Sequence, residues 1–375
     1  MPFLVGRPLA RSAVAGAAAA VTGLAYASLV EIRWFALRTA VLPILPAGHP
    51  DLRVLHLSDL HLTPTQHRKQ DWLRGLSRLR PDLVVNTGDN LAHRDAVPVL
   101  LDALGDLLDV PGVFVRGSND YYSPTTRNPV RYLLPDDGSR HTDTPLLPWP
   151  DMVTGFEDRG WVDLDNQKAV LSVGNTTFAF AGVDDPHLGY DDLAAVAGPA
   201  DRTADVRIAL AHAPYLRVLD QFAADGYDAV FAGHTHGGQL CLPGGGAIIT
   251  NCDLDPARAK GLHRHPAASP VGTPGSAWLH VSAGLGTSPF VPVRFCCRPE
   301  ATLLTLTAPG RMHRPACASY RLSSPSRALG LWRSLVARFV RDEEAAGSNP
   351  VSPTEIEAPT SSRGGLCPSS ASLWR

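Results

Sequence analysis

The sequence has no excess of either charge. Its 375 residues include 34 lysines and arginines against 36 aspartates and glutamates, which gives a formal net charge of -2. A dedicated nucleic-acid-binding protein needs a broad basic surface to neutralise phosphates. The charge balance therefore predicts no dedicated nucleic-acid binding, and it confines any phosphate chemistry to a local site.

Paired cysteines are also missing. None of the six cysteines forms a Cys-x-x-Cys pattern, and a chain of this length needs no disulfide framework. Hydrophobic residues make up 44% of the chain and charged residues 19%, values typical of globular proteins that exclude a collagen, a coiled coil or a wholly disordered chain. We expect one large or two medium folded domains.

Long hydrophobic runs are scarce, with one exception near the N-terminus. Residues 12–30 carry no charge and are just long enough to span a membrane. Their apolar character comes mostly from alanine and glycine, so insertion would be marginal, and a clear signal-peptide cleavage site is missing. Three interpretations stay open: an uncleaved membrane anchor, an export signal, and a soluble or peripheral helix. The protein is accordingly predicted to be membrane-associated through a single anchor, or cytoplasmic.

The composition divides the chain into three parts. Residues 1–50 combine this apolar segment with a proline-containing linker. Residues 51–308 alternate short aliphatic runs with amphipathic helical patterns, which favours an α/β fold with a strand-rich second half. Residues 309–375 change to arginine, serine and proline, and we expect a disordered or spurious C-terminal extension.

Five of the aliphatic runs end directly in a polar motif. Each motif taken alone is more typical of a plain turn, but strand ends are where open α/β sheets bind ligands. The motifs, in chain order, are Asp59-Leu60-His61, Gly88-Asp89-Asn90, Gly117-Ser118-Asn119-Asp120, Ala211-His212-Ala213-Pro214 and Gly233-His234-Thr235-His236.

These motifs supply a consistent set of metal-ligand side chains. Two aspartates, one asparagine and four histidines mix hard oxygen ligands with imidazoles, which suits Mn²⁺, Fe or Zn²⁺ rather than a thiolate site. Seven ligands are too many for one tetrahedral ion. We therefore expect two divalent metal ions that share a bridging carboxylate.

The ordered set of motifs resembles the calcineurin-like metallophosphoesterase family over roughly residues 53–307. The sequences around His61 and His236 are similar to a bacterial branch of membrane-associated phosphoesterases related to UDP-diacylglucosamine pyrophosphatases. The resemblance implies a four-layer α/β/β/α sandwich. It also implies an enzyme that hydrolyses a phosphate ester or pyrophosphate bond through attack of a metal-bridging hydroxide.

The resemblance assigns a role to each motif residue. Carried over position by position, it implies Asp59, His61 and His236 at one ion, Asp89 between the two ions, and His212, His234 and an asparagine at the second.

The third motif departs from the family pattern of Gly-Asn-His-Asp or Glu. A gapless match places Ser118 at the asparagine position, whereas a shift of one residue brings Asn119 to the metal. An amide oxygen binds a hard cation better than a neutral hydroxyl, which favours Asn119, and we take Asn119 and Asp89 as the catalytic residues. The usual histidine is missing in either case. We therefore expect a preference for good leaving groups, unless His93 or His187 supplies the proton.

The sequence leaves substrate and alternatives open. We expect a phosphorylated small molecule or lipid as substrate, with residues 132–150 as a loop that sets the choice. The oligomeric state cannot be deduced. A metal-bound binding module with weak or no catalysis is the alternative function.

Other polar residues near the motifs have structural interpretations. His56 and His280 lie inside apolar runs, and we expect them to be buried, hydrogen-bonded histidines rather than ligands. We expect Asp184-Asp185 to form either an acidic turn or a contact to the site.

Overall fold

The computed structural model describes residues 20–126, 138, 140, 142–244 and 246–310. The chain divides into two units, Met1–Leu322 and Ser323–Arg375, and every described residue belongs to the first unit. The expected C-terminal extension therefore lies almost wholly outside the described residues, as does the first part of the apolar segment. Residues 20–29 of that segment form a helix.

The first of two mixed sheets contains six strands. Neighbouring strands run parallel except for β12 and β2, which are antiparallel. In spatial order the strands are β1 (Ala36–Leu42), β12 (Glu300–Leu306), β2 (Leu52–Leu57), β3 (Leu83–Asn86), β4 (Gly112–Phe114) and β5 (Trp161–Asp163).

The second sheet also contains six strands. Its outer pairs, β10 with β11 and β7 with β6, are antiparallel, and its inner pairs are parallel. In spatial order the strands are β10 (Gly261–His265), β11 (Ala277–Val281), β9 (Ala229–Ala232), β8 (Val206–Ala211), β7 (Thr176–Gly182) and β6 (Gln167–Val173).

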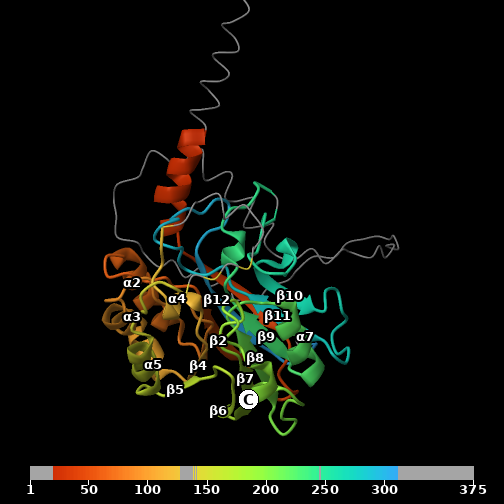
Figure 1. Cartoon of the computed structure of the whole chain (residues 1–375). Helices are drawn as coiled ribbons and strands as arrows, with labels where there is room; N and C mark the ends of the chain where they lie inside the picture. Colours follow the sequence, from red (N-terminus) through yellow and green to blue (C-terminus); the bar gives the residue numbers. More distant parts are fainter. Residues whose placement is uncertain (1–19, 127–137, 139, 141, 245, 311–375) are drawn as a thin grey trace, which may run out of the picture. The chain divides into compact units, whose positions relative to one another are not determined.

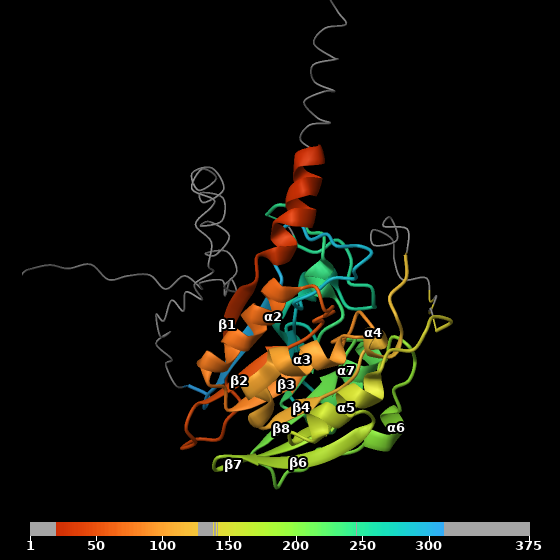
Figure 2. The same cartoon turned by 90° about the vertical axis from the view of Figure 1, so that its left-hand side faces the viewer.

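Helices cover the outer faces of the sheets. Figure 1 shows one group of α-helices on one side of the strands and α7 on the other, and Figure 2 shows the first group in front of β2, β3 and β4. The α-helices are α2 (His67–Arg74), α3 (Val97–Leu104), α4 (Ser118–Tyr121), α5 (Trp149–Glu157), α6 (Leu193–Val196) and α7 (Leu216–Asp225). Short 3-10 helices are η1 (Glu31–Arg33), η2 (Gly75–Leu79), η3 (Gly105–Asp109), η5 (His236–Gly238) and η6 (Pro256–Arg258).

Three apolar clusters separate the layers. Because side chains alternate along a strand, Leu55 and Leu57 of β2 pack outward with α2, α3 and α5, whereas Val54 packs inward. The inner cluster joins Val54 and Val85 to Phe178 and other residues of the second sheet, and a third cluster packs α7 on that sheet's outer face. These layers confirm the expected α/β/β/α sandwich.

The first sheet begins earlier than the sequence predicts. Strand β1 lies inside residues 1–50, and it pairs in parallel with β12 along its whole length. Arg38 and Thr39 interrupt the aliphatic pattern of this strand, which is why it is hard to recognise. Arg38 forms an ion pair with Glu300 at 3.1 Å. The expected boundary at residue 51 therefore does not mark the start of the sheet.

Membrane-spanning length is not reached by any helix in the part of the chain that the structure describes. The helix at residues 20–29 is nevertheless exposed. Val21, Leu24 and Leu29 have 68%, 63% and 63% of their surface accessible, whereas Ala27 is buried and Tyr26 packs on Phe295.

Candidate metal centre

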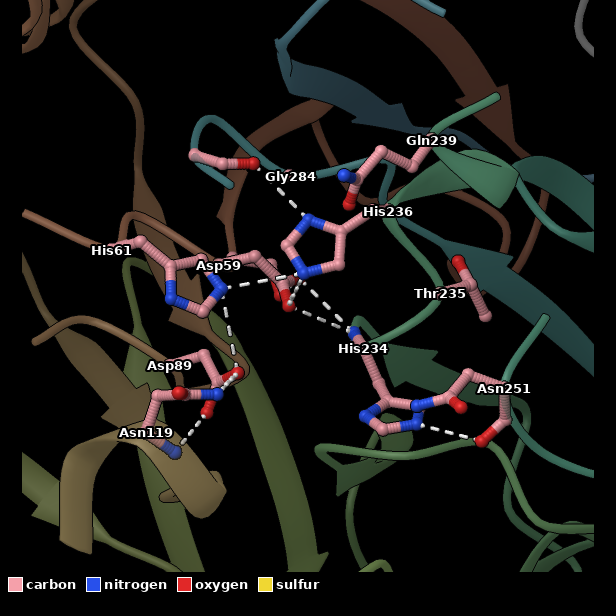
Figure 3. A network of polar contacts seen from close by, with 12 residues as sticks. Asp59, His61, Asp89, Asn119, His234, Thr235, His236, Gln239, Asn251 and Gly284 are labelled. Carbon is pink, nitrogen blue, oxygen red and sulfur yellow. Dashed lines mark hydrogen bonds and ion pairs between the residues drawn. The ribbon is translucent and has the colours of Figure 1, made fainter. Parts of the chain in front are cut away.

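The five motifs meet at one edge of the sandwich. Strands β2 and β3 end at the loops of Asp59 and Asp89, α4 begins beside Asn119 after β4, and β8 and β9 lead to the histidine loops. The carboxyl ends of parallel strands lie at the same edge of a sheet, so residues far apart in sequence converge there. Figure 3 shows residues of four of the five motifs close together: Asp59 and His61, Asp89, Asn119, and His234 and His236.

The first group of ligand atoms comes from Asp59, His61 and His236, which lie within 4.8 Å of one another. The Nε2 atoms of the two imidazoles are 3.3 Å apart, and His236 Nε2 is 3.7 Å from Asp59 Oδ1. Burial lowers the pKa of His61 to about 4 and holds the pKa of His236 well below its usual value. Two neutral imidazoles and a carboxylate turned toward one point match the donor set of a divalent ion.

The second group joins Asp59, Asp89 and His212, again within 4.8 Å. His212 Nδ1 lies 2.6 Å from the carbonyl oxygen of Thr87, and its Nε2 is buried without a hydrogen-bond partner among the described residues. An imidazole that donates through one nitrogen to a backbone carbonyl and leaves the other bare is typical of a metal ligand.

Asp89 lies between the two groups. Its Oδ2 atom is 3.5 Å from His61 Nε2 and 3.5 Å from His212 Nε2. One carboxylate oxygen is therefore equally close to an imidazole of each group. Asp59 also contributes to both groups, so two carboxylates, rather than the single one expected from the sequence, lie where the groups meet.

Asn119 contacts the carboxylate of Asp89. Its backbone N–H donates to Asp89 Oδ1 and its side-chain Nδ2 to Asp89 Oδ2, both at 2.7 Å. Ser118 Oγ accepts from the same Nδ2 at 3.3 Å. Of the two candidates, Asn119 is thus the one whose side chain contacts the Asp89 carboxylate.

His234 is placed differently from the other expected ligands. Its backbone N–H donates to the two oxygens of Asp59 at 3.2 and 3.1 Å. Its ring Nε2 lies 3.1 Å from the carbonyl oxygen of Asn251, as Figure 3 shows, although the ring itself is edge-on to His212 at 5.3 Å. His234 therefore borders the second group without joining it.

Opposite charges compensate one another inside this buried cluster. Burial, with Asp89 adding to it, raises the pKa of Asp59 to about 6. Burial alone would also raise the pKa of Asp89, but His212 and His61 outweigh it and hold the pKa well below its usual value. For His212 burial opposes protonation, yet Asp89 and Asp185 raise its pKa well above the usual value. A buried cluster of this kind needs positive charge, which a cation supplies.

Backbone strain is concentrated at the same residues. A positive φ is uncommon for residues other than glycine, and it clusters at functional sites. Five of the seven expected ligands adopt it: Asp59 (φ 49°), His61 (40°), Asp89 (56°), His234 (67°) and His236 (49°).

Gly88 allows two of the loops to meet. Its φ is +89°, and a Cβ atom at this position would lie 2.6 Å from the backbone nitrogen of Gly117. Only glycine combines this conformation with this approach.

Asp120 is a structural residue whose role the sequence does not reveal. Its buried carboxylate accepts the backbone N–H groups of Asp89 (2.8 Å), Asn90 (2.7 Å), Leu91 (3.2 Å) and Gly117 (3.0 Å). It thereby ties the loop after β3 to the loop after β4. The sequence signal for this role is that an acidic residue directly follows Asn119.

The Asp184-Asp185 pair lies beside the centre. Asp184 accepts the Tyr121 hydroxyl at 2.8 Å with both oxygens. Burial raises the pKa of Asp185 to about 7, and the nearby His212 acts in the opposite direction. Asp185 Oδ1 also accepts the backbone N–H of His187, which lies two residues further on, at 2.9 Å, so the pair forms an acidic turn and also lies near His212.

A pocket opens over the two groups. His187 lines it, whereas His93 is not among the lining residues and accepts the backbone N–H of Asp95 instead. Arg140, from the expected substrate loop, also lines the pocket, where it donates to the His187 carbonyl and, at 3.1 Å, to the Tyr215 hydroxyl. The pocket wall thus offers a cation beside the metal-ligand side chains.

Comparison with known proteins agrees with this geometry. Residues 52–238 match the profile of the Calcineurin-like phosphoesterase family. The chain is 30% identical over 294 residues to UDP-2,3-diacylglucosamine pyrophosphatase LpxG of Chlamydia trachomatis, covering 68% of this chain and 83% of that protein. It is 24% identical over 309 residues to Phosphodiesterase YaeI of Escherichia coli, covering 81% and 100%. It is 27% identical over 298 residues to the uncharacterised YpbG of Bacillus subtilis, covering 78% and 95%.

Proposed function

Because the chain belongs to the calcineurin-like phosphoesterase family, whose members are metal-dependent phosphoester hydrolases, we propose that it holds two divalent ions and hydrolyses a phosphate ester or pyrophosphate bond. The observation that carries this proposal is the position of Asp89 Oδ2, 3.5 Å from one imidazole of each ligand group. A carboxylate placed in this way is suited to bridge two ions.

The residues present fit such a pair of ions. His212 Nε2 is buried without a hydrogen-bond partner among the described residues, and the His61 and His236 Nε2 atoms face each other at 3.3 Å. We propose that the ions would be held by Asp59, His61 and His236 on one side, by His212 and Asn119 on the other, and by Asp89 between them. His234, whose ring Nε2 faces the Asn251 carbonyl in this structure, would complete the second set. Nitrogen and oxygen donors of this kind accept Mn²⁺, Fe or Zn²⁺.

Two bound ions would activate a water molecule as nucleophile and offset the charge of the phosphate oxygens. The chain's own residues prepare the site for this chemistry. Asn119 donates twice to Asp89 and fixes the orientation of that carboxylate. Arg140 adds positive charge to the pocket wall, where it can hold a phosphate oxygen.

The leaving group is the point at which this site differs from the family pattern. The usual histidine of the third motif is absent, and Asn119 directs its amide to Asp89. Of His93 and His187, the two histidines that could supply the proton, His187 is the one that lines the pocket. We therefore propose a substrate with a good leaving group, such as a diester or pyrophosphate, because strong proton donation is then less necessary.

We propose that the substrate is a phosphorylated lipid. The relative LpxG is a UDP-2,3-diacylglucosamine pyrophosphatase by name, and that substrate is a diacylated sugar nucleotide. In this chain the uncharged segment 12–30 includes the helix at residues 20–29, on which Val21, Leu24 and Leu29 are exposed. Both observations support an N-terminal association with a membrane.

Hydrolysis by the full chain tests the function. We would compare an aryl phosphodiester, an aryl monoester and a pyrophosphate with and without Mn²⁺, using Asp102→Asn as the control because Asp102 is exposed and is not among the residues that line the pocket. Mn²⁺-dependent turnover, retained in Asp102→Asn and lost in Asp89→Asn, is the expected result. Metal binding without turnover of any of the three would instead favour the metal-bound binding module.

A further inference from the structure

A chain of buried hydrogen bonds leads from the space between the sheets to Asp59. His280 Nδ1 lies 2.8 Å from His56 Nδ1, and His56 Nε2 lies 2.9 Å from the hydroxyl of Thr87. Thr87 Oγ1 is 2.7 Å from Ser58 Oγ, which is 2.6 Å from Asp59 Oδ2. All five side chains are buried, with 2% or less of their surface exposed.

The donor and the acceptor of each hydrogen bond in this network can be assigned by starting from the Asp59 carboxylate. A carboxylate accepts, so the Ser58 hydroxyl donates to Asp59 and must accept from Thr87. Because the Thr87 hydroxyl donates its one proton to Ser58, it accepts a hydrogen bond from His56, which therefore donates through Nε2. Burial lowers the pKa of His56 well below its usual value and that of His280 to about 3, which keeps both rings neutral. His56 Nδ1 is therefore an acceptor, and His280 donates through Nδ1.

The two histidines lie in an apolar interior, where burying polar groups costs folding free energy. His56 belongs to β2 of the first sheet and His280 to β11 of the second, and the His56 ring also packs edge-on to Phe231 at 5.2 Å. Buried polar groups in an apolar interior are tolerated only when all of their hydrogen bonds are made. An ordinary pair of aliphatic residues would fill the same space without that requirement.

Thr87 connects this hydrogen-bond network to both groups of expected ligands. Its hydroxyl acts on Asp59 through Ser58, whereas its backbone carbonyl accepts His212 Nδ1 at 2.6 Å. Ser58 occupies Oδ2 of Asp59, and Oδ1 is the atom that lies 3.7 Å from His236 Nε2.

We propose that His280, His56 and Thr87 are positioning residues of the hydrolase, which hold the Ser58 hydroxyl as a donor to Asp59 Oδ2 and so turn Oδ1 toward the first ion. This inference rests on the proposed function, because it assumes that Asp59 is a ligand. Residues that orient ligands through hydrogen bonds commonly change metal affinity or activity by about 10- to 100-fold when they are replaced.

The first test reads the proton positions without any turnover. Nitrogen-15 NMR of the imidazoles in the full chain, assigned by single histidine substitutions, is expected to show His56 protonated at Nε2 and His280 at Nδ1. The reverse pair of tautomers would overturn the proposal. This result does not depend on whether the protein hydrolyses phosphate esters, so its failure and the failure of the proposed function are distinguishable.

The second test uses the isosteric variant Thr87→Val, which removes the hydroxyl and keeps the backbone carbonyl. We expect calorimetric titration with Mn²⁺ to show an affinity about 10- to 100-fold weaker, with kcat lowered and KM little changed, and Thr87→Ser to restore both. The matched control is Thr176→Val. Thr176 is likewise fully buried and lies 3.0 Å from an imidazole, His49 Nδ1, but belongs to β7. Equal Mn²⁺ affinities in Thr87→Val, Thr176→Val and the unaltered chain would overturn the proposal.

Discussion

The Nε2 atoms of His61 and His236 lie 3.3 Å apart, although 175 positions separate the two residues in sequence. Two imidazoles bound at about 2.0–2.1 Å to one tetrahedral ion have nitrogen atoms about 3.3–3.4 Å apart. The rings are also nearly parallel, with an interplanar angle of 24°. The fold therefore holds this pair at the spacing of ligands that share one ion.

The two candidates for the unusual third motif can be separated by their side chains. Asn119→Ala removes the amide that donates to Asp89, and we expect it to weaken metal binding about 10-fold or more. Ser118→Ala removes only a hydroxyl that accepts from Asn119, and we expect a change of less than about threefold. Metal titration of both variants is the measurement. A larger loss for Ser118→Ala would assign the ligand position to Ser118.

The missing histidine of the third motif predicts a change in substrate preference. In the gapless match the missing histidine falls at Asn119, so Asn119→His restores it. At saturating Mn²⁺ we expect this variant to raise the rate for an alkyl monoester relative to an aryl diester by about 10-fold or more, because general acids contribute about 10²–10⁴-fold. Steady-state kinetics with both esters gives the ratio. An unchanged ratio would mean that leaving-group protonation does not depend on this position.

Gly88 should be sensitive to substitution for two separate reasons. Gly88→Ala and Gly226→Ala both place a side chain at a φ near +88°, which costs roughly 1–2 kcal/mol of unfolding free energy. Only Gly88→Ala also crowds the backbone of Gly117, because nothing lies within 4 Å of a Cβ at Gly226. We expect similar strain in both, with greater destabilisation and loss of metal binding in Gly88→Ala alone. Denaturant unfolding and metal content measure these effects, and equal metal content would contradict the account.

Stability at acid pH should depend on the buried histidine pair. Burial lowers the pKa of His280 from 6.5 to about 3, so below pH 6.5 the unfolded chain binds a proton that the folded chain does not. The free energy of unfolding therefore falls as the pH drops from 6.5 toward 3. Between about pH 5.5 and 4, His280→Leu should reduce that slope by about one proton, or about 1.4 kcal/mol per pH unit. Denaturant unfolding across this range measures the slope, and an unchanged slope would mean that His280 titrates normally.

The sequence predicts the local features of the centre better than the contacts between segments. Asp59, Asp89 and His212 are recognisable because each follows an aliphatic run, and the family that the ordered motifs resemble implies the sandwich. The role of Asp120 depends on backbone groups of the loop 30 residues away, which no local pattern records. The ring of His234 turns to Asn251 for the same kind of reason.

Strand β1 and the hydrogen bonds of Thr87 illustrate the same limit. β1 is recognisable only through its pairing with β12, because Arg38 and Thr39 hide its pattern. His56 and His280 were expected as buried, hydrogen-bonded histidines, and the structure confirms this, but their pairing joins two sheets and 224 positions of sequence. Contacts of this kind are properties of the folded chain rather than of any segment.

The central claim is that Asp89 joins two ions in one hydrolytic centre, and metal content tests it most directly. Elemental analysis of the full chain, the Asp89→Asn variant and the Asp102→Asn control would be combined with aryl phosphodiester hydrolysis. We predict close to two divalent ions per chain in the unaltered protein and in Asp102→Asn. For Asp89→Asn we predict a clear loss of metal and an activity lower by more than about 100-fold, since replacing residues that only support ligands already costs up to that much. A chain that binds no divalent metal, or an Asp89→Asn variant with full metal content and activity, would contradict the account.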